Sequence, residues 1–132
     1  MPMRPFLLNL ALGCLLLPLA AVAGEIDQAQ ALKALAQPGA VLIDVRSADE
    51  FATGALPGAR LIPHDQIGAR IGAAVPDKNT PIVLYCRSGR RSSLAQDELQ
   101  ALGYRHVINA GGYDQFKLAS GQNAEEPACS DC

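Results

Sequence analysis

The sequence lacks most of the features that mark specialised protein classes. Its 132 residues contain no internal repeat and no low-complexity segment, which excludes a repeat array. Eleven basic residues stand against 13 acidic ones and form no basic stripe outside one arginine cluster, so we expect no nucleic-acid partner. The two histidines, His64 and His106, have no metal-ligand spacing with each other or with a carboxylate cluster. We therefore expect neither a metal nor a cofactor.

Cysteine is scarce, with four residues in the whole chain. Cys14 lies in the apolar N-terminal segment, Cys86 ends an apolar run, and Cys129 and Cys132 form a C-x-x-C pair near the end of the sequence. Removal of the N-terminal segment would leave an odd number of cysteines, which in an oxidising compartment indicates a free or reactive thiol. Because the C-x-x-C pair can close on itself, Cys86 is the cysteine that remains to be explained.

The first 23 residues have the pattern of a secretory signal peptide. A short basic start, MPMR, precedes an apolar stretch, and residues 21–23 form an A-x-A cleavage site. We expect cleavage after Ala23, which leaves 10 basic and 13 acidic residues. The alternative is an uncleaved membrane anchor, because residues 6–23 nearly reach the ~20 apolar residues that span a bilayer. Pro18 and the small residues after it favour cleavage.

Apolar runs alternate with amphipathic segments along the rest of the chain. Largely apolar runs, typical of buried strands, cover residues 40–46 and 81–86, and residues 104–110 are predicted as another strand. Helical patterns cover residues 25–37, 65–75, 92–103 and 113–120. Strands that alternate with helices predict an α/β fold, in which a parallel central sheet has helices on both faces. A chain of 132 residues is long enough for one domain and too short for two.

Local patterns also predict where individual side chains point. In the helix that follows Cys86, Leu94, Leu99 and Leu102 are expected to face the core. Tyr85 precedes Cys86 on the same strand, so its side chain should lie on the opposite face of the sheet and contribute to packing.

The carboxyl ends of the strands are the expected location of a site, because ligands of open α/β sheets bind there. Cys86 ends one predicted strand, and Asp44 and Arg46 end a neighbouring one. These three side chains should therefore meet at the same edge of the sheet.

The loop after Cys86, with the sequence CRSGRRS, has the composition of an anion cradle. Main-chain N–H groups of residues 87–91 can point at the sulfur, and Gly89 permits the turn that this requires. Cationic neighbours and a helix N-terminus lower a cysteine pKa from ~8.5 to ~3.5–7.5, which produces the nucleophilic thiolate. A buried, inert cysteine is the alternative, but it does not explain the three arginines beside it, which are Arg87, Arg90 and Arg91.

Three motifs in this order resemble the rhodanese family. They are DVRSADEFATGALPGARLIP, CRSGRRS and NAGGYDQF, and the resemblance covers roughly residues 29–118. Within the family, the chain is most similar to the small periplasmic phage-shock-protein E type. The resemblance implies a rhodanese domain over residues 24–119, after the secretory signal peptide expected over residues 1–23. Residues 120–132 form a polar tail outside the family domain that carries the C-x-x-C pair. The resemblance also implies a periplasmic location.

The resemblance implies a mechanism as well. Cys86 would attack the outer sulfur of a donor such as thiosulfate and become a persulfide, and cyanide or a thiol would then accept the sulfur. A protein could serve as the acceptor. The cradle for donor and persulfide would consist of Arg87, Ser88, Gly89, Arg90 and Arg91. No stable membrane association is expected once the signal peptide has been removed.

The sequence departs from the family pattern at two places. Ala55 stands where the family usually has histidine, and the closing tryptophan is absent, so we expect Phe116 to fill its place in the core. Asp44 and Arg46 match the family's DVR segment, and we expect them to form a salt-bridged pair that braces the loop, which Glu50 could join.

Two other functions remain open. A cysteine-dependent phosphatase or arsenate reductase has the same fold, but its arginine lies six residues after the cysteine, whereas Arg91 lies five residues after Cys86. A persulfide or sulfide carrier that serves a partner protein without turnover is the second alternative. A steady-state assay with thiosulfate and a small acceptor would separate a carrier from an enzyme.

The C-x-x-C pair of the tail also has more than one interpretation. Cys129 and Cys132 could form a plain disulfide, or a redox pair that takes sulfur from Cys86 or reduces its persulfide. Metal binding is the third possibility, although two cysteines cannot complete a four-ligand zinc site alone.

Overall fold

The computed structural model describes residues 25–121. The predicted signal peptide, the C-x-x-C pair and most of the predicted tail lie outside the described residues. In the part of the chain that is described, no helix is long and apolar enough to cross a membrane.

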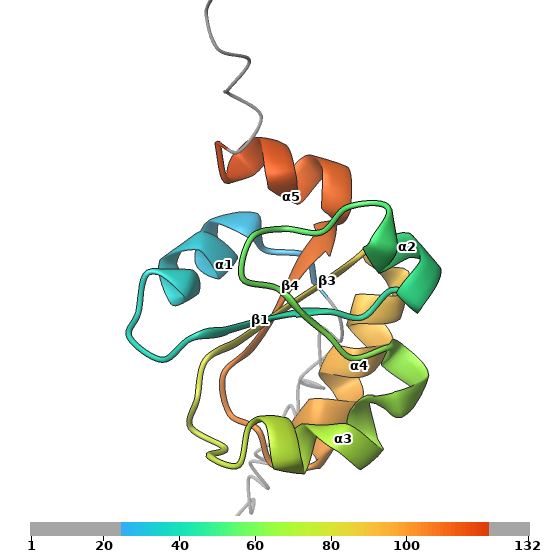
Figure 1. The fold of residues 1–132 in the computed structure, drawn as a ribbon. Helices are drawn as coiled ribbons and strands as arrows, with labels where there is room; N and C mark the ends of the chain where they lie inside the picture. Colours follow the sequence, from blue (N-terminus) through green and yellow to red (C-terminus); the bar gives the residue numbers. More distant parts are fainter. Residues whose placement is uncertain (1–24, 122–132) are drawn as a thin grey trace, which may run out of the picture.

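The centre of the fold is a parallel sheet of four strands in the order β2-β1-β3-β4 (Figure 1). The strands are β1 (Val41–Asp44), β2 (Arg60–Leu61), β3 (Ile82–Cys86) and β4 (Val107–Gly112). The two central strands, β1 and β3, are apolar almost throughout, since a strand covered on both faces needs no polar side. The predicted parallel sheet is confirmed.

Helices cover both faces of the sheet, as predicted (Figure 1). One face packs against α3 (Ile67–Ala74), which follows a short 3₁₀ turn, η1 (His64–Gln66), and against α4 (Arg90–Ala101). The other face packs against α1 (Gln28–Leu35) and α5 (Tyr113–Ala119). The remaining helix, α2 (Ala48–Ala52), follows β1 and has no buried residue.

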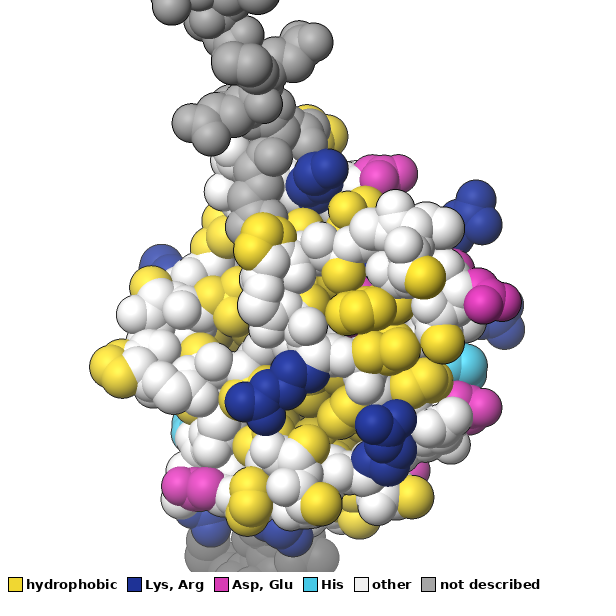
Figure 2. All heavy atoms as spheres, in the orientation of Figure 1, with side chains coloured by type: hydrophobic (Ala, Val, Ile, Leu, Met, Phe, Trp, Pro, Cys, Tyr) yellow, Lys and Arg dark blue, Asp and Glu magenta, His cyan; other side chains and the backbone are white. Residues whose placement is uncertain are grey.

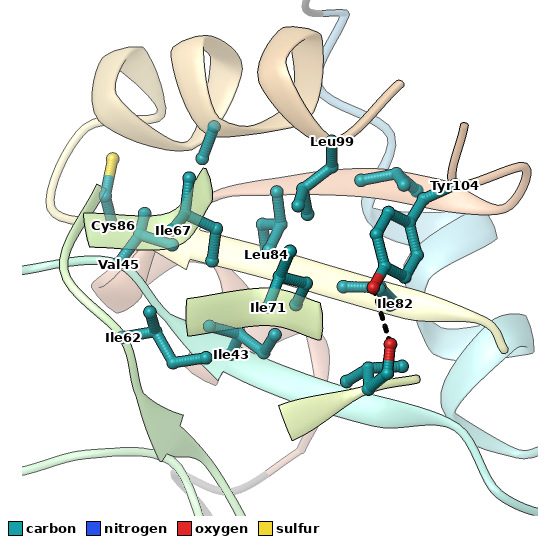
Figure 3. Packing of buried hydrophobic residues seen from close by; sticks show 13 residues of the cluster. Ile43, Val45, Ile62, Ile67, Ile71, Ile82, Leu84, Cys86, Leu99 and Tyr104 are labelled. Atoms are coloured by element: carbon teal, nitrogen blue, oxygen red, sulfur yellow. Dashed lines mark hydrogen bonds between the residues drawn. The ribbon is translucent and has the colours of Figure 1, made fainter. Parts of the chain in front are cut away.

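Successive residues of β3 enter two separate cores. Ile82, Leu84 and Cys86 belong to the cluster beneath α3 and α4, whereas Val83 and Tyr85 belong to the cluster beneath α1 and α5. Figure 3 shows Cys86 at the end of its strand, on the same side as Leu84, with its sulfur towards the overlying helix. The prediction that Tyr85 lies opposite Cys86 is confirmed.

The buried face of α4 differs from the predicted one. Leu99 is fully buried, as expected, but Leu94 is 55% exposed and Leu102 is 40% exposed. The residues that face the core are Ser92, Ala95, Gln96 and Leu99. These four positions have the i, i+3, i+4, i+7 spacing of one helix face, and Leu94 and Leu102 fall outside it. The Ser92 hydroxyl on this face lies 3.4 Å from the Cys86 sulfur.

The prediction that Phe116 is a core residue is confirmed, because this side chain of α5 is 1% exposed and lies in the second core.

Candidate active site

The loop between β3 and α4 holds the candidate nucleophile at the carboxyl edge of the sheet. Cys86 is the last residue of β3, and α4 begins at Arg90, so residues 87–89 form the whole connection. Gly89 caps the helix with a φ of +94°, a left-handed conformation that glycine adopts without strain. This short turn brings the first N–H groups of α4 towards the sulfur, as the sequence predicted.

Donors from the loop converge on the Cys86 sulfur. The Gly89 N–H group donates to Sγ at 2.9 Å, and the Ser92 hydroxyl lies 3.4 Å from it. Burial opposes ionisation of the thiol, but hydrogen bonds from the Ser92 side chain and from the N–H groups of Ser92, Ser88 and Gly89 outweigh it. Together they lower the pKa of Cys86 below its ordinary value. The site therefore favours a thiolate although the residue is fully buried.

The three arginines of the loop separate into two kinds. Arg91 forms two hydrogen bonds with Glu50 of α2, at 2.6 and 2.9 Å. Arg87 and Arg90 are exposed. The partner of Glu50 is thus Arg91, not the Asp44–Arg46 pair that the sequence suggested it could join. Charge from the two exposed arginines is available to an incoming anion.

The Glu50–Arg91 pair ties α2 to α4. Glu50 also completes a capping box with Ser47, the residue that caps α2. The bond from Arg91, helped by those from Ser47, lowers the pKa of Glu50 to about 2. Glu50 is thus ionised at neutral pH and holds Arg91, the second residue of α4, in place.

Asp44 and Arg46 form the predicted ion pair at the end of β1. Arg46 Nη2 lies 2.6 Å from Asp44 Oδ2 and also donates to the Gly54 carbonyl at 2.7 Å. Its guanidinium lies 4.5 Å from the centre of the Tyr113 ring. Burial disfavours the charged guanidinium, but the bonds to Asp44 reverse this and raise the pKa of Arg46. Arg46 thus connects the end of β1 with the segment after α2 and with the start of α5.

A polar depression of about 280 Å³ lies beside the loop. It is lined by Arg46, Glu50, Thr53, Arg87, Tyr113 and Asp114. On the face that Figure 2 shows, lysine and arginine side chains stand apart from one another and form no continuous stripe.

Two residues in contact with the loop were not predicted from the sequence. The side chains of Ser92 and Asn109 are both fully buried, and Ser92 Oγ lies 2.7 Å from Asn109 Oδ1. Ser92 was interpreted only as the start of a helix, and Asn109 only as part of a motif. An asparagine inside an otherwise apolar strand is the pattern that could have identified the second of them.

Within residues 25–121, no group of three histidine, cysteine, aspartate or glutamate side chains could hold a metal ion. Cys86 is the free cysteine of this part of the chain.

Comparisons with known proteins agree on one family. The Rhodanese-like domain profile matches residues 27–119. The thiosulfate sulfurtransferase PspE of Escherichia coli K12 is 44% identical over 76 residues, which cover 58% of this chain and 73% of that protein. A sulfurtransferase of Allochromatium vinosum is 37% identical over 89 residues, covering 67% of this chain and 81% of the relative.

The fold has a counterpart among solved structures. A structure described as a rhodanese with anions from E. coli superposes with a TM-score of 0.55 and 42% sequence identity. The match covers 56% of this chain and 87% of that one.

Proposed function

Because the chain belongs to the rhodanese-like family, we propose that it is a sulfurtransferase that moves the outer sulfur of thiosulfate to cyanide or a thiol through a persulfide on Cys86. The observation that carries this proposal is the position of the Cys86 sulfur. It lies at the start of the twelve-residue helix α4, where Gly89 donates an N–H bond to it and its pKa is lowered. A stabilised thiolate at a helix N-terminus is the state that nucleophilic sulfur chemistry requires.

The first half-reaction conserves charge and needs no added oxidant. The Cys86 thiolate attacks the outer sulfur of thiosulfate, a new S–S bond forms, and the bond to the central sulfur breaks so that sulfite leaves with the electron pair. The persulfide that remains carries one negative charge, as the thiolate did. The Gly89 N–H group and the Ser92 hydroxyl contact the Cys86 sulfur, which becomes the inner sulfur of the persulfide, and these contacts support the proposal that the loop holds the intermediate.

In the second half-reaction, cyanide or a thiolate attacks the outer sulfur of the persulfide. The S–S bond breaks, and Cys86 departs as the thiolate that began the cycle. The same donors stabilise the sulfur of Cys86 as a leaving group, so one cradle serves both steps. Separate donor and acceptor steps predict ping-pong kinetics.

The ion pair of Arg91 favours sulfur chemistry over phosphate chemistry. Both terminal nitrogens of Arg91 donate hydrogen bonds to Glu50, so the guanidinium is not free to form a bidentate contact with two phosphate oxygens. The loop is also one residue shorter than the phosphatase spacing. We therefore expect poor turnover of aryl phosphates.

The test is a steady-state assay of the full-length mature protein with thiosulfate and cyanide. Cys86→Ser should abolish transfer and leave the fold intact by circular dichroism, whereas the double variant Cys129→Ser, Cys132→Ser is the matched control for loss of a thiol. Undiminished transfer by Cys86→Ser would overturn the proposal. A wild-type protein that accumulates persulfide but does not turn over would instead support the carrier function.

The same proposal includes a periplasmic location after cleavage at Ala23. Its support is the basic start, the apolar stretch and the A-x-A sequence of residues 1–23. N-terminal sequencing of the exported protein should give Gly24, and an intact Met1 end in the inner membrane would contradict it.

A further inference from the structure

Asn109 is a fully buried polar residue that the proposed mechanism does not use. It lies in β4 opposite Leu84, and the register shifts immediately afterwards, since Tyr85 pairs with Gly111. Gly111 has a φ of +85°, which fits such an irregularity. Bulges of this kind redirect a side chain, and here the asparagine meets the turn that holds Cys86.

The contacts of Asn109 fix the orientation of its amide. Nδ2 donates to the Gly89 carbonyl at 3.2 Å, whereas Oδ1 accepts from the Gly111 N–H group at 2.9 Å. Its main-chain carbonyl accepts from Asp27 at 2.9 Å, which attaches the segment before α1. A 180° flip of the amide would therefore lose both side-chain hydrogen bonds. The amide also bonds to the carbonyl of Gly89, whose N–H group donates to the sulfur.

The Ser92 hydroxyl has one proton and three acceptors within reach. They are Asn109 Oδ1 at 2.7 Å, the Gly89 carbonyl at 3.1 Å and the Cys86 sulfur at 3.4 Å. The shortest contact is to Asn109, and when the proton lies there a lone pair of Ser92 Oγ can face the neutral thiol. Once the sulfur is negatively charged it becomes the stronger acceptor, and the hydroxyl can rotate towards it while Oδ1 keeps its bond from Gly111.

We propose that Asn109 is a positioning residue that clamps the Gly89 turn and gives the Ser92 hydroxyl an alternative acceptor, so that the hydroxyl turns to Cys86 when its sulfur is charged. The inference rests on the proposed function only in taking Cys86 as the reactive sulfur. Among the charged groups around the site, Arg91 of α4 is paired with Glu50 of α2, and Asp44 is paired with Arg46. Arg87 and Arg90 of the loop are exposed, and the Asn109 variants leave both unchanged.

The test is the pH profile of Cys86 alkylation by iodoacetamide in the full-length protein. Trypsin releases residues 79–87 as one peptide, so mass spectrometry reads Cys86 apart from the other cysteines. Asn109→Asp replaces the donor to Gly89 with an acceptor and puts a carboxylate within about 6 Å of the sulfur, as the two contacts through Ser92 require. The thiolate fraction near neutral pH should fall about tenfold.

The control is Asn79→Asp, an exposed asparagine that precedes β3 at the opposite end of the sheet. It should leave the profile unchanged. Because alkylation needs no sulfur donor, this result stands whether or not the protein proves to be a sulfurtransferase.

A double-mutant cycle with Ser92→Ala shows whether Asn109 changes the reactivity of Cys86 through the Ser92 hydroxyl. A carboxylate that acts only through its charge would shift the profile equally in both backgrounds. If Asn109 acts through the hydroxyl, the tenfold loss should shrink to about threefold or less once Ser92 is alanine. Equal shifts in the two backgrounds, or no shift at all, would overturn the proposal. If Asn109→Asp does not fold, Asn109→Ala removes the clamp without a charge, and an unchanged Cys86 profile in that variant would overturn it equally.

Discussion

At the scale of single residues, the site depends on one backbone conformation. Gly89 has a φ of +94°, and a Cβ there would lie 3.3 Å from Gly111 Cα and 2.6 Å from the tip of the Ile26 side chain. The isoleucine tip can move, but the left-handed backbone costs a residue with a side chain roughly 1–2 kcal/mol. The turn is therefore the least replaceable part of the loop besides the cysteine.

Gly89→Ala should lower the free energy of unfolding by about 1–2 kcal/mol and reduce thiosulfate turnover at least tenfold, because the N–H group leaves the sulfur. Urea unfolding and a steady-state assay measure the two effects. Gly72 of α3 is the matched control, since an added Cβ there has nothing within 4 Å. Gly72→Ala should stabilise the protein by up to about 1 kcal/mol at full activity. Equal activity of the two variants would contradict the role of the turn.

The exposed arginines should act on the donor through their charge. Arg87→Ala and Arg90→Ala are each expected to lower kcat/KM for thiosulfate about tenfold, and to lower it less for a neutral sulfur donor. Added salt should narrow the difference, because exposed charges are screened over ~8–10 Å at ordinary ionic strength.

Arg105→Ala, in an exposed arginine that precedes β4 at the far end of the sheet, is the control and should change neither constant. If kcat/KM falls equally for charged and neutral donors and the fall does not depend on salt, Arg87 and Arg90 shape the loop and do not attract the anion.

Among the secondary-structure elements, α2 and α4 are connected by the ion pair of Glu50 and Arg91, and the strength of this pair depends on pH. The pKa of Glu50 is lowered from its ordinary value of 4.5 to about 2. The ionised carboxylate therefore stabilises the fold fully at pH values above 4.5, and this stabilisation is lost as the pH falls through about 2. Both side chains are 28% exposed, so solvent screening limits the contribution to about 1 kcal/mol.

Glu50→Gln should therefore lower the free energy of unfolding by about 1 kcal/mol at pH 7, and by less at pH 3. Urea unfolding of both proteins at the two pH values measures the difference. Glu98→Gln, in an exposed carboxylate of α4 outside this pair, controls for the loss of a surface charge. If the free energies of unfolding of Glu50→Gln and the wild type differ as much at pH 3 as at pH 7, the ion pair is not the cause of the difference.

The elements also show what local sequence can and cannot predict. The apolar run that ends in Cys86 and the glycine three residues later are local patterns, and they predicted the strand, the turn and the facing N–H groups. Leu94 and Leu102 were wrongly predicted to be buried, because the buried face of α4 carries only one leucine, Leu99. Its other members are Ser92, Ala95 and Gln96, which side-chain hydrophobicity does not single out. The Glu50–Arg91 pair joins residues 41 positions apart, so only the tertiary fold brings them together.

At the scale of the whole molecule, a parallel sheet collects separate segments at one edge. Asp44 lies there at the end of β1, and Cys86 at the end of β3. Asn109 lies in β4 next to the register shift, and its side chain contacts the turn after Cys86. Alternation of strands and helices was enough to predict this architecture. It could not predict the role of Asn109, since that depends on a register shift within β4.

The central claim is that Cys86 stores the transferred sulfur, and peptide mass spectrometry tests it most directly. The full-length mature protein is mixed with thiosulfate without an acceptor, digested, and then compared with a sample to which cyanide is added before digestion. We expect one extra sulfur atom on the peptide of residues 79–87, and we expect it to be lost on addition of cyanide as thiocyanate appears. Sulfur transfer at the full rate with an unmodified Cys86 peptide, or with the extra sulfur on Cys129 or Cys132 instead, would contradict it.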